Sequence, residues 1–172
     1  MALPGQATMA SRFAPLLALS PLVVWLDQWT KVLVVRQMVL YQSHDLLPGW
    51  FAFTYIQNRG AVFGILAGHN QWWRLPLFLG LAAVAVVLLA LYYAHSRPEQ
   101  TLLRNALALV LGGAIGNVID RIRLGYVIDF LDCSWHGHHW PAFNLADAAI
   151  TTGIGLMLLD GLLEGRRHKE TA

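Results

Sequence analysis

Four long apolar segments constrain this chain more than any other feature of its sequence. They run from about 13 to 35, 75 to 94, 102 to 119 and 143 to 163. A membrane-spanning helix needs roughly 20 mostly apolar residues, because the hydrocarbon core is about 30 Å thick and a helix rises 1.5 Å per residue. The sequence therefore predicts an all-α membrane protein with four transmembrane helices.

The low content of charged residues supports this fold class. Charged residues make up 13% of the 172 residues, whereas a soluble domain usually carries about 25%. The length suits one domain, 1–172. The only cysteine is Cys133, so no intrachain disulfide can form, and the net charge of +2 indicates no nucleic-acid partner.

The first apolar segment has an alternative interpretation as a cleaved signal peptide. Asp27 and Lys31 oppose it, because a cleavage region should be small and neutral. We expect a retained span preceded by a flexible stretch, 1–10, in which Met9 is a possible alternative start.

Four spans place both termini on one side of the membrane. The basic tail favours the cytoplasm for that side, although six Lys and Arg fall on each side, so the preference is modest. Segments 37–74 and 121–142 would then be periplasmic. Within the first, the aromatic run Trp50–Ile56 follows Pro48-Gly49 and is typical of a strand.

Charges inside the apolar segments need a reason, because each central Asp, Lys or Arg costs about 2.5 to 3.5 kcal/mol on insertion scales. Asp27 and Lys31 are four residues apart and share a helical face. Two interpretations stay open: the pair only orients the helix, or it also positions active-site groups.

Two further motifs combine glycines with polar side chains. Asn58-Arg59-Gly60 predicts a tight turn leading back to the membrane. In Gly112–Arg121, the glycines at 112 and 116 form a small-residue face for helix packing. That packing does not account for Asn117, Asp120 and Arg121. Arg121 has its own alternative, which is to extend to the headgroups.

Asp129 and Asp147 are the strongest catalytic candidates. They are 147 − 129 = 18 residues apart, one after the third span and one at the start of the fourth, so both should lie near the same membrane face. A helix N-terminus favours Asp147 for structural reasons alone. Asp129 lies among Val, Ile and Phe and has no such explanation.

Two carboxylates about 4 Å apart repel by about 4 kcal/mol at an effective dielectric near 20. One would stay protonated at neutral pH while the other ionises, which is the aspartic-protease arrangement. The ionised member can activate water, and the protonated member can donate to the peptide carbonyl.

Other functions fit less well. The loop Cys133–His139 contains histidines whose spacing matches no standard zinc pattern, so we expect no metal. A transporter should carry charge through the depth of the membrane, yet the second apolar segment has none. A scaffold protein would tolerate loss of Asp129.

Five motifs, in this order along the chain, resemble those of the bacterial lipoprotein signal peptidases (signal peptidase II). They are Asp27-Gln28-x-x-Lys31, Asn58-x-Gly60-Ala61-x-Phe63, Gly112-Gly113-Ala114-x-Gly116-Asn117-x-x-Asp120-Arg121, Val127-x-Asp129-Phe130 and Phe143-Asn144-x-Ala146-Asp147.

The resemblance implies four helices with a small periplasmic β-sheet cradle in the bacterial inner membrane. It implies an aspartyl endopeptidase without cofactor that cleaves lipidated prolipoproteins just before the lipid-modified cysteine. Asp129 and Asp147 match the catalytic pair. Residues matching the substrate-binding or dyad-supporting positions are Asn58, Gly60, Asn117, Asp120, Arg121, Asn144, Asp27 and Lys31. The expected partners are the prolipoprotein and membrane lipid, and the expected state is a monomer.

Overall fold

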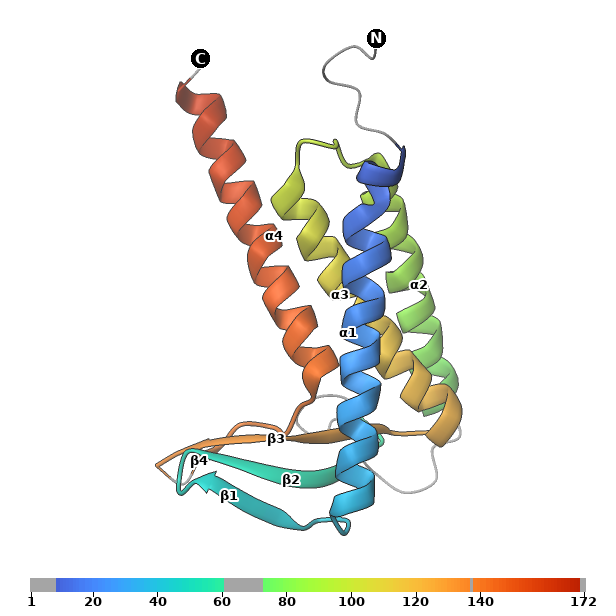
Figure 1. Cartoon of the computed structure of the whole chain (residues 1–172), viewed down its shortest axis with the longest axis vertical. Coiled ribbons are helices and arrows are strands. Elements are labelled where there is room, and N and C mark those ends of the chain that lie inside the picture. The colour runs from blue at the N-terminus through green and yellow to red at the C-terminus, as the bar shows by residue number, and fades with distance from the viewer. Residues whose placement is uncertain (1–8, 61–72, 137, 171–172) are drawn as a thin grey trace.

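A computed structural model describes residues 9–60, 73–136 and 138–170. Within them, four long helices form a bundle: α1 (Met9–Gln37), α2 (Arg74–His95), α3 (Thr101–Leu124) and α4 (Leu145–Glu170). Figure 1 shows a small sheet at one end of this bundle, with the start of α1 and the end of α4 at the other. We call these the sheet end and the terminal end.

The predicted spans are confirmed as four helices long and apolar enough to cross a membrane. α3 continues to Leu124 rather than ending near 119, because its C-cap is Gly125 in the left-handed region at φ +78°. Asn117, Asp120 and Arg121 are therefore helical. α1 begins at Met9, so residues 9 and 10 of the stretch expected to be flexible are helical, and residues 1–8 lie outside the described part.

α3 is the central helix of the bundle. Twelve of its residues are buried, whereas in α2 two are, and apolar side chains of α2 such as Leu81, Val84 and Leu88 are more than half exposed. Near the terminal end, α3 packs through Leu103 and Leu107 against Tyr93, and Phe13 and Met157 cover this cluster. The apolar core thus lies toward the terminal end, and the buried polar residues of α3, Asn117 and Asp120, lie toward the sheet end.

Glycines let α1 and α4 approach α3 closely at the sheet end. A Cβ on Gly116 would lie 2.6 Å from the Asp27 carboxylate on α1, and one on Gly112 would lie 2.9 Å from the Ser20 backbone oxygen. Gly113 faces the backbone of Ala146 on α4 in the same way. The small-residue face predicted from 112 and 116 is thus occupied by α1.

The sheet is antiparallel with the strand order β1-β2-β3-β4, and α2 and α3 lie between β2 and β3 in the chain. Its strands are β1 (Ser43–Leu47), β2 (Phe51–Asn58), β3 (Val127–Trp135) and β4 (His138–His139). The strand predicted over 50–56 corresponds to β2. In register, Phe51 pairs with Cys133 at one end of the sheet and Asn58 pairs with Val127 at the other. The second end lies against the bundle and carries the polar residues described next.

Candidate active site

Asp129 lies on β3 with only 2% of its surface exposed. One carboxylate oxygen accepts a hydrogen bond from Asn58 Nδ2 at 2.9 Å, and the other accepts one from Asn144 Nδ2 at 2.8 Å. The pKa of Asp129 is raised to about 7, mainly because the carboxyl is buried; the charge of Asp147 also raises it, whereas the two asparagine donors lower it. The carboxyl can therefore hold a proton near neutral pH.

Backbone hydrogen bonds fix the orientation of both asparagine amides. The N–H of Gly60 donates to Asn58 Oδ1 at 3.0 Å, and the N–H of Asp147 donates to Asn144 Oδ1 at 2.9 Å. A backbone N–H can bond only to the amide oxygen, so each NH₂ group must point at Asp129. The fold thus aims two donors at this one carboxyl group.

Asp147 lies in the first turn of α4, where it forms a reciprocal cap with Asn144. Its carboxylate accepts the N–H of Asn144 at 3.3 Å while its own N–H bonds to the Asn144 side chain. This is the capping-box arrangement, in which two otherwise unpaired N–H groups are satisfied. Asn117 Nδ2 also donates to Asp147 at 2.7 Å. Asp147 is thus held by two donors at the start of α4.

Asn144 connects the two aspartates directly. Its side chain donates to Asp129 while its backbone donates to Asp147, and it is fully buried. The same Nδ2 also lies 3.2 Å from Asn117 Oδ1 and 3.3 Å from the Ile128 carbonyl. The two carboxyl groups, which come from β3 and α4, therefore border one polar cluster.

A buried ion network supports this cluster from α1. Lys31 Nζ lies 2.8 Å from a carboxylate oxygen of Asp27 and 2.8 Å from one of Asp120, and it donates to Asn117 Oδ1 at 3.2 Å. All three charged side chains are at most 3% exposed. The other oxygen of Asp27 accepts the N–H of Ala146 at 3.0 Å. Asp27 thereby bonds to a free N–H in the first turn of α4, beside Asp147.

Gln28 also belongs to this network, although no role for it was predicted from the sequence. Its Nε2 donates to Asp120 at 2.8 Å and to Asp27 at 3.2 Å, so the amide holds both carboxylates. The signal was its place between Asp27 and Lys31 in the first motif. A glutamine in an apolar helix needs a polar partner as much as a charged residue does.

Arg121 contributes charge to the cluster without a hydrogen bond to either aspartate among the described residues. Its Nη1 donates to the Asn117 carbonyl at 3.4 Å, and its guanidinium lies over the Phe78 ring, 5.2 Å from the centroid. Its positive charge interacts electrostatically with both Asp147 and Asp129. Arg121 therefore faces the cluster as well as packing against α2.

One further residue predicted from the sequence, Gly60, also lies beside the cluster. Gly60 joins through its bond to Asn58, whereas Ala61 and Phe63 lie outside the described residues. The histidine loop is separate from the cluster. His139 Nδ1 contacts Asp132 at 3.0 Å further along β3, and within the described residues no three His, Cys, Asp or Glu side chains gather as metal ligands.

The fold and this cluster define an integral membrane protein with a buried polar site at one end of its bundle. Its relatives are consistent with that class. The family model for signal peptidase (SPase) II matches residues 19–163, and the chain belongs to the signal peptidase II family. It is therefore a peptidase.

Two curated relatives show how far the similarity extends. The lipoprotein signal peptidase of Syntrophotalea carbinolica is 50% identical over 159 residues, covering 92% of this chain and 98% of the relative. The lipoprotein signal peptidase of Geobacter sulfurreducens is 50% identical over 142 residues, covering 83% and 88%.

A solved structure described as "Bacterial membrane enzyme structure by the in meso method at 2.3 A resolution" has the same fold. It superposes with a TM-score of 0.80 at 27% identity and covers 98% of this chain and 96% of that one.

Proposed function

We propose that this protein is an aspartyl endopeptidase that cleaves the signal peptide from diacylglyceryl-modified prolipoproteins immediately before the lipidated cysteine. The observation that carries the proposal is that Asn144 bonds to both Asp129 and Asp147 at the end of a membrane bundle. Two carboxyl groups beside one shared donor are the arrangement an aspartic peptidase uses to activate water.

The two aspartates have different environments, and this difference supports a division of roles between them. Asp129 is almost fully buried and has a pKa near 7, so it is the member that carries the proton. Asp147 accepts hydrogen bonds from Asn117 and from the backbone N–H of Asn144, and we give it the complementary role toward water. Asp147 is thus the general base and Asp129 the general acid.

The reaction then follows in balanced steps. Asp147 takes a proton from water as the water oxygen bonds to the scissile carbonyl carbon, and Asp129 gives its proton to the carbonyl oxygen. In the resulting tetrahedral intermediate, the proton on Asp147 passes to the leaving nitrogen and the C–N bond breaks. One hydroxyl proton returns to Asp129, leaving a carboxylic acid on the signal peptide and a free amine on the lipidated cysteine.

The remaining cluster residues hold this pair and the substrate. Asn58, Asn117 and Asn144 orient the carboxyl groups, and Gly60 fixes the Asn58 amide. Arg121 provides positive charge beside the pair. Asp27, Lys31 and Asp120 help to set the position of α4 relative to α3. Asp27 on α1 bonds to the Ala146 N–H of α4 and to Lys31, and Lys31 in turn contacts Asp120 on α3.

The position of the cluster suits a membrane-anchored substrate. A lipidated precursor presents its cleavage point where its signal helix leaves the hydrocarbon core. We place the enzyme in the bacterial inner membrane as a monomer, with both termini cytoplasmic and the sheet end periplasmic. The basic tail favours this orientation, whereas the count of six lysines and arginines on each side does not distinguish the two. Labelling of single cysteines from outside intact cells is therefore the direct check.

Incubation of the purified enzyme with a diacylglyceryl-modified precursor, followed by mass analysis, tests the activity. We expect two products that divide before the modified cysteine. The same precursor without the lipid serves as the matched control and should be cut far more slowly. Equal cleavage of both forms, or cleavage at another bond, would contradict the proposed specificity.

A further inference from the structure

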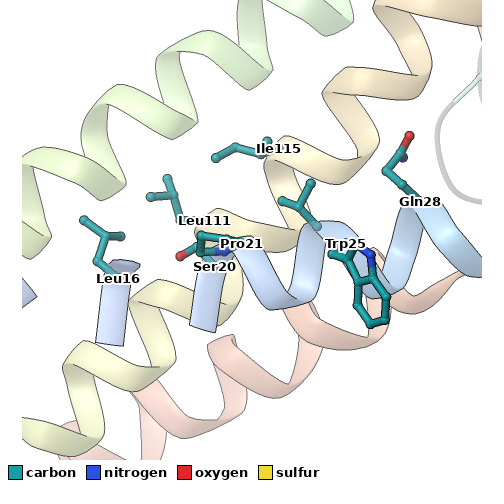
Figure 2. Close-up of a pocket in the computed structure, with 8 residues that line it drawn as sticks. Leu16, Ser20, Pro21, Trp25, Gln28, Leu111 and Ile115 are labelled. Atoms are coloured by element: carbon teal, nitrogen blue, oxygen red, sulfur yellow. The ribbon is translucent and has the colours of Figure 1, made fainter. Parts of the chain in front are cut away.

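A groove between α1 and α3 lies outside the polar cluster. It is lined by one side of α1 from Leu16 to Gln28 and by Leu111 and Ile115 of α3, and we call it the α1–α3 groove. Figure 2 shows Leu16 at one end of these lining residues and Gln28 at the other. Among the residues that the structure describes, the lining includes neither proposed catalytic aspartate nor the asparagines that hold them. The groove is therefore separate from the candidate active site.

The polar side chains in the lining of the groove are already paired within the protein. Ser20 Oγ donates to the Ala108 carbonyl at 2.8 Å, and Gln28 Nε2 donates to Asp120 at 2.8 Å. The other lining residues are apolar apart from the indole N–H of Trp25. A polar ligand would find few partners in this groove and would lose its own hydrogen bonds to water. The lining therefore favours an apolar occupant.

The dimensions of the groove suit a single hydrocarbon chain. Leu16 and Gln28 are 28 − 16 = 12 residues apart on α1, which is about 18 Å at 1.5 Å per residue. The hydrocarbon core is about 30 Å thick, so one leaflet contributes about 15 Å. The groove has a volume of about 550 Å³, whereas an 18 Å length of helix about 10 Å across occupies roughly 1,400 Å³. The groove can thus enclose one extended acyl chain but not another helix.

The Leu16 end of the groove meets the apolar core. Leu16 packs against the cluster formed by Tyr93, Leu103 and Leu107 near the terminal end of the bundle. The ring of Phe13 stacks on Tyr93 of α2, with centroids 6.0 Å apart. A chain lying in the groove therefore has its apolar end at Leu16 and its polar end toward Gln28.

A cation lies beside the Gln28 end of the groove. Arg123 is exposed, and its Nη1 donates to Gln28 Oε1 at 3.5 Å. It is the residue before the last of the α3 span, Thr101–Leu124, which places it at the edge of the hydrocarbon core. Within the described part of the chain, no carboxylate forms a salt bridge with Arg123. A guanidinium at this position suits a phosphate, because it can donate two parallel hydrogen bonds to phosphate oxygens.

We propose that the α1–α3 groove binds one phospholipid of the leaflet on the sheet side, with an acyl chain along Leu111 and Ile115 and the phosphate on Arg123. Arg123 and Leu111 are 123 − 111 = 12 residues apart on α3, again about 18 Å. An acyl chain whose phosphate lies at Arg123 thus reaches the full length of the groove. The charge at one end and the apolar lining along the rest match the two parts of a phospholipid.

The bound phospholipid supports the buried ion network through Gln28. The Gln28 amide nitrogen donates to both Asp120 and Asp27, and its oxygen accepts from Arg123. A chain in the groove keeps water away from this amide, and hydrogen bonds are stronger where water is excluded. Phospholipid binding therefore stabilises the contact between α1 and α3, whereas the chemistry at the two aspartates does not require it.

Native mass spectrometry of the full chain, titrated with phosphatidylglycerol in detergent, tests the site. We expect one phosphatidylglycerol to bind the native enzyme more tightly than all others. Its affinity should fall at least about 10-fold in Arg123→Gln, which removes the phosphate contact, and in Ile115→Trp, which fills the groove. Two matched controls should bind it as the native enzyme does. They are Arg97→Gln, at an exposed position in the turn between α2 and α3, and Leu81→Trp, at a 59% exposed position on α2.

Thermal unfolding provides a second measurement of the same site. Phosphatidylglycerol at a large excess over its dissociation constant should raise the Tm of the delipidated native enzyme by about 5 °C, because it binds only the folded chain. The Tm of Ile115→Trp should stay unchanged on the same addition. Val24→Trp fills the groove from the α1 wall and takes the place of Ile115→Trp if that variant does not fold.

Three results would overturn the proposal. A native enzyme without a tightly bound phospholipid, or equal binding by Ile115→Trp, would show that the groove is not a lipid site. Equal binding by Arg123→Gln would remove the phosphate contact. Release of the phospholipid by an added lipidated precursor would assign the groove to the substrate instead. None of these measurements needs catalysis, so failure of the lipid site is distinguishable from failure of the proposed peptidase function.

Discussion

The two ends of the sheet are built on opposite principles. At the bundle end, Asp129 is 2% exposed and both of its oxygens have fixed donors. At the other end of the sheet, which carries Trp50, Trp135 and Trp140 and which we call the tip, Trp135 on the same strand is 61% exposed. One strand thus runs from a fully paired polar cluster to an open apolar surface within seven residues.

The difference shows what each end can tolerate. A buried polar cluster loses the most when one partner is removed, because the remaining groups stay buried and unpaired. An exposed surface loses little, because water replaces each missing contact. Substitutions at matched positions on the same strands can therefore test whether function and stability are concentrated at the bundle end.

The largest effect should come from the two aspartates. Asp129→Asn and Asp147→Asn each remove a proton-transfer group, and loss of one such group costs about 10² to 10⁴ in rate. We expect cleavage of a lipidated precursor to fall at least about 10³-fold, with the fold retained in detergent. Asp132→Asn, three residues along β3 from Asp129, is the matched control and should keep nearly full activity. A purified Asp129→Asn or Asp147→Asn enzyme that still cleaves would remove that residue from the catalytic role.

Stability should show the same contrast between the buried Lys31 network and the exposed contact of His139 with Asp132. Lys31→Met leaves Asp27 and Asp120 buried without their cation, and breaking a buried pair costs about 3 to 5 kcal/mol. His139→Ala breaks the pair with Asp132, in which the histidine is 65% exposed, and should cost under about 1 kcal/mol. Thermal unfolding in detergent measures both. Similar melting temperatures for the two variants would mean that the buried network is not a main source of stability.

Close helix packing predicts an intermediate effect. Gly116→Ala would place a Cβ 2.6 Å from the Asp27 carboxylate, which is held by Lys31 and the Ala146 N–H. Overpacking of this kind costs about 1 to 3 kcal/mol. Gly155→Ala on α4 meets nothing within 4 Å and should instead stabilise the helix by about 0.5 to 1 kcal/mol. Opposite shifts in melting temperature are the expected result, and a neutral Gly116→Ala would show that α1 can move away from α3.

The sequence predicted the bundle end far better than the tip, and the reason is physical. Apolar length alone predicts the four spans, and charges in apolar segments cost enough that Asp27, Lys31, Asp120 and Asp129 had to be explained. The exposed tryptophans of the tip carry no such cost, so nothing in their spacing marked them as a group. Only the pairing of Trp50 with Ser134 brings the two turns together.

The sequence also left out how the cluster is connected. Capping of α4 by Asn144 and Asp147 could be read from the motif, because polar residues three apart before an apolar run favour a helix start. The bond from Asp27 to the Ala146 N–H could not, because it joins positions 119 residues apart. The predicted end of α3 was also too early. Asp120 and Arg121 look like the end of an apolar span, but the helix continues to Leu124 and is capped by Gly125.

The smallest effect is a shift in the pH profile of the reaction. It should distinguish Asn58, at the end of β2 beside Asp129, from Thr54 further along the same strand. With Asp129 as the general acid, the protonated enzyme is active, so kcat/KM, which reports the pKa of the free enzyme, should fall as pH rises through about 7 and then drop about tenfold per pH unit. The bond from Asn58 favours the ionised carboxylate and lowers its pKa. Asn58→Leu removes that bond and keeps the space filled, so the pKa of Asp129 rises and the alkaline limb should move to higher pH.

Thr54→Val is the matched control for this shift, because Thr54 lies on the same strand but bonds to Asp132 rather than to Asp129. Its alkaline limb should coincide with that of the native enzyme. The position of the limb is the decisive measurement, since the height of the profile can change for many reasons in either variant. If instead activity rises with pH through about 7 in the native enzyme, and this acidic limb moves to higher pH in Asn58→Leu, Asp129 must be ionised for activity, which would exchange the roles of Asp129 and Asp147.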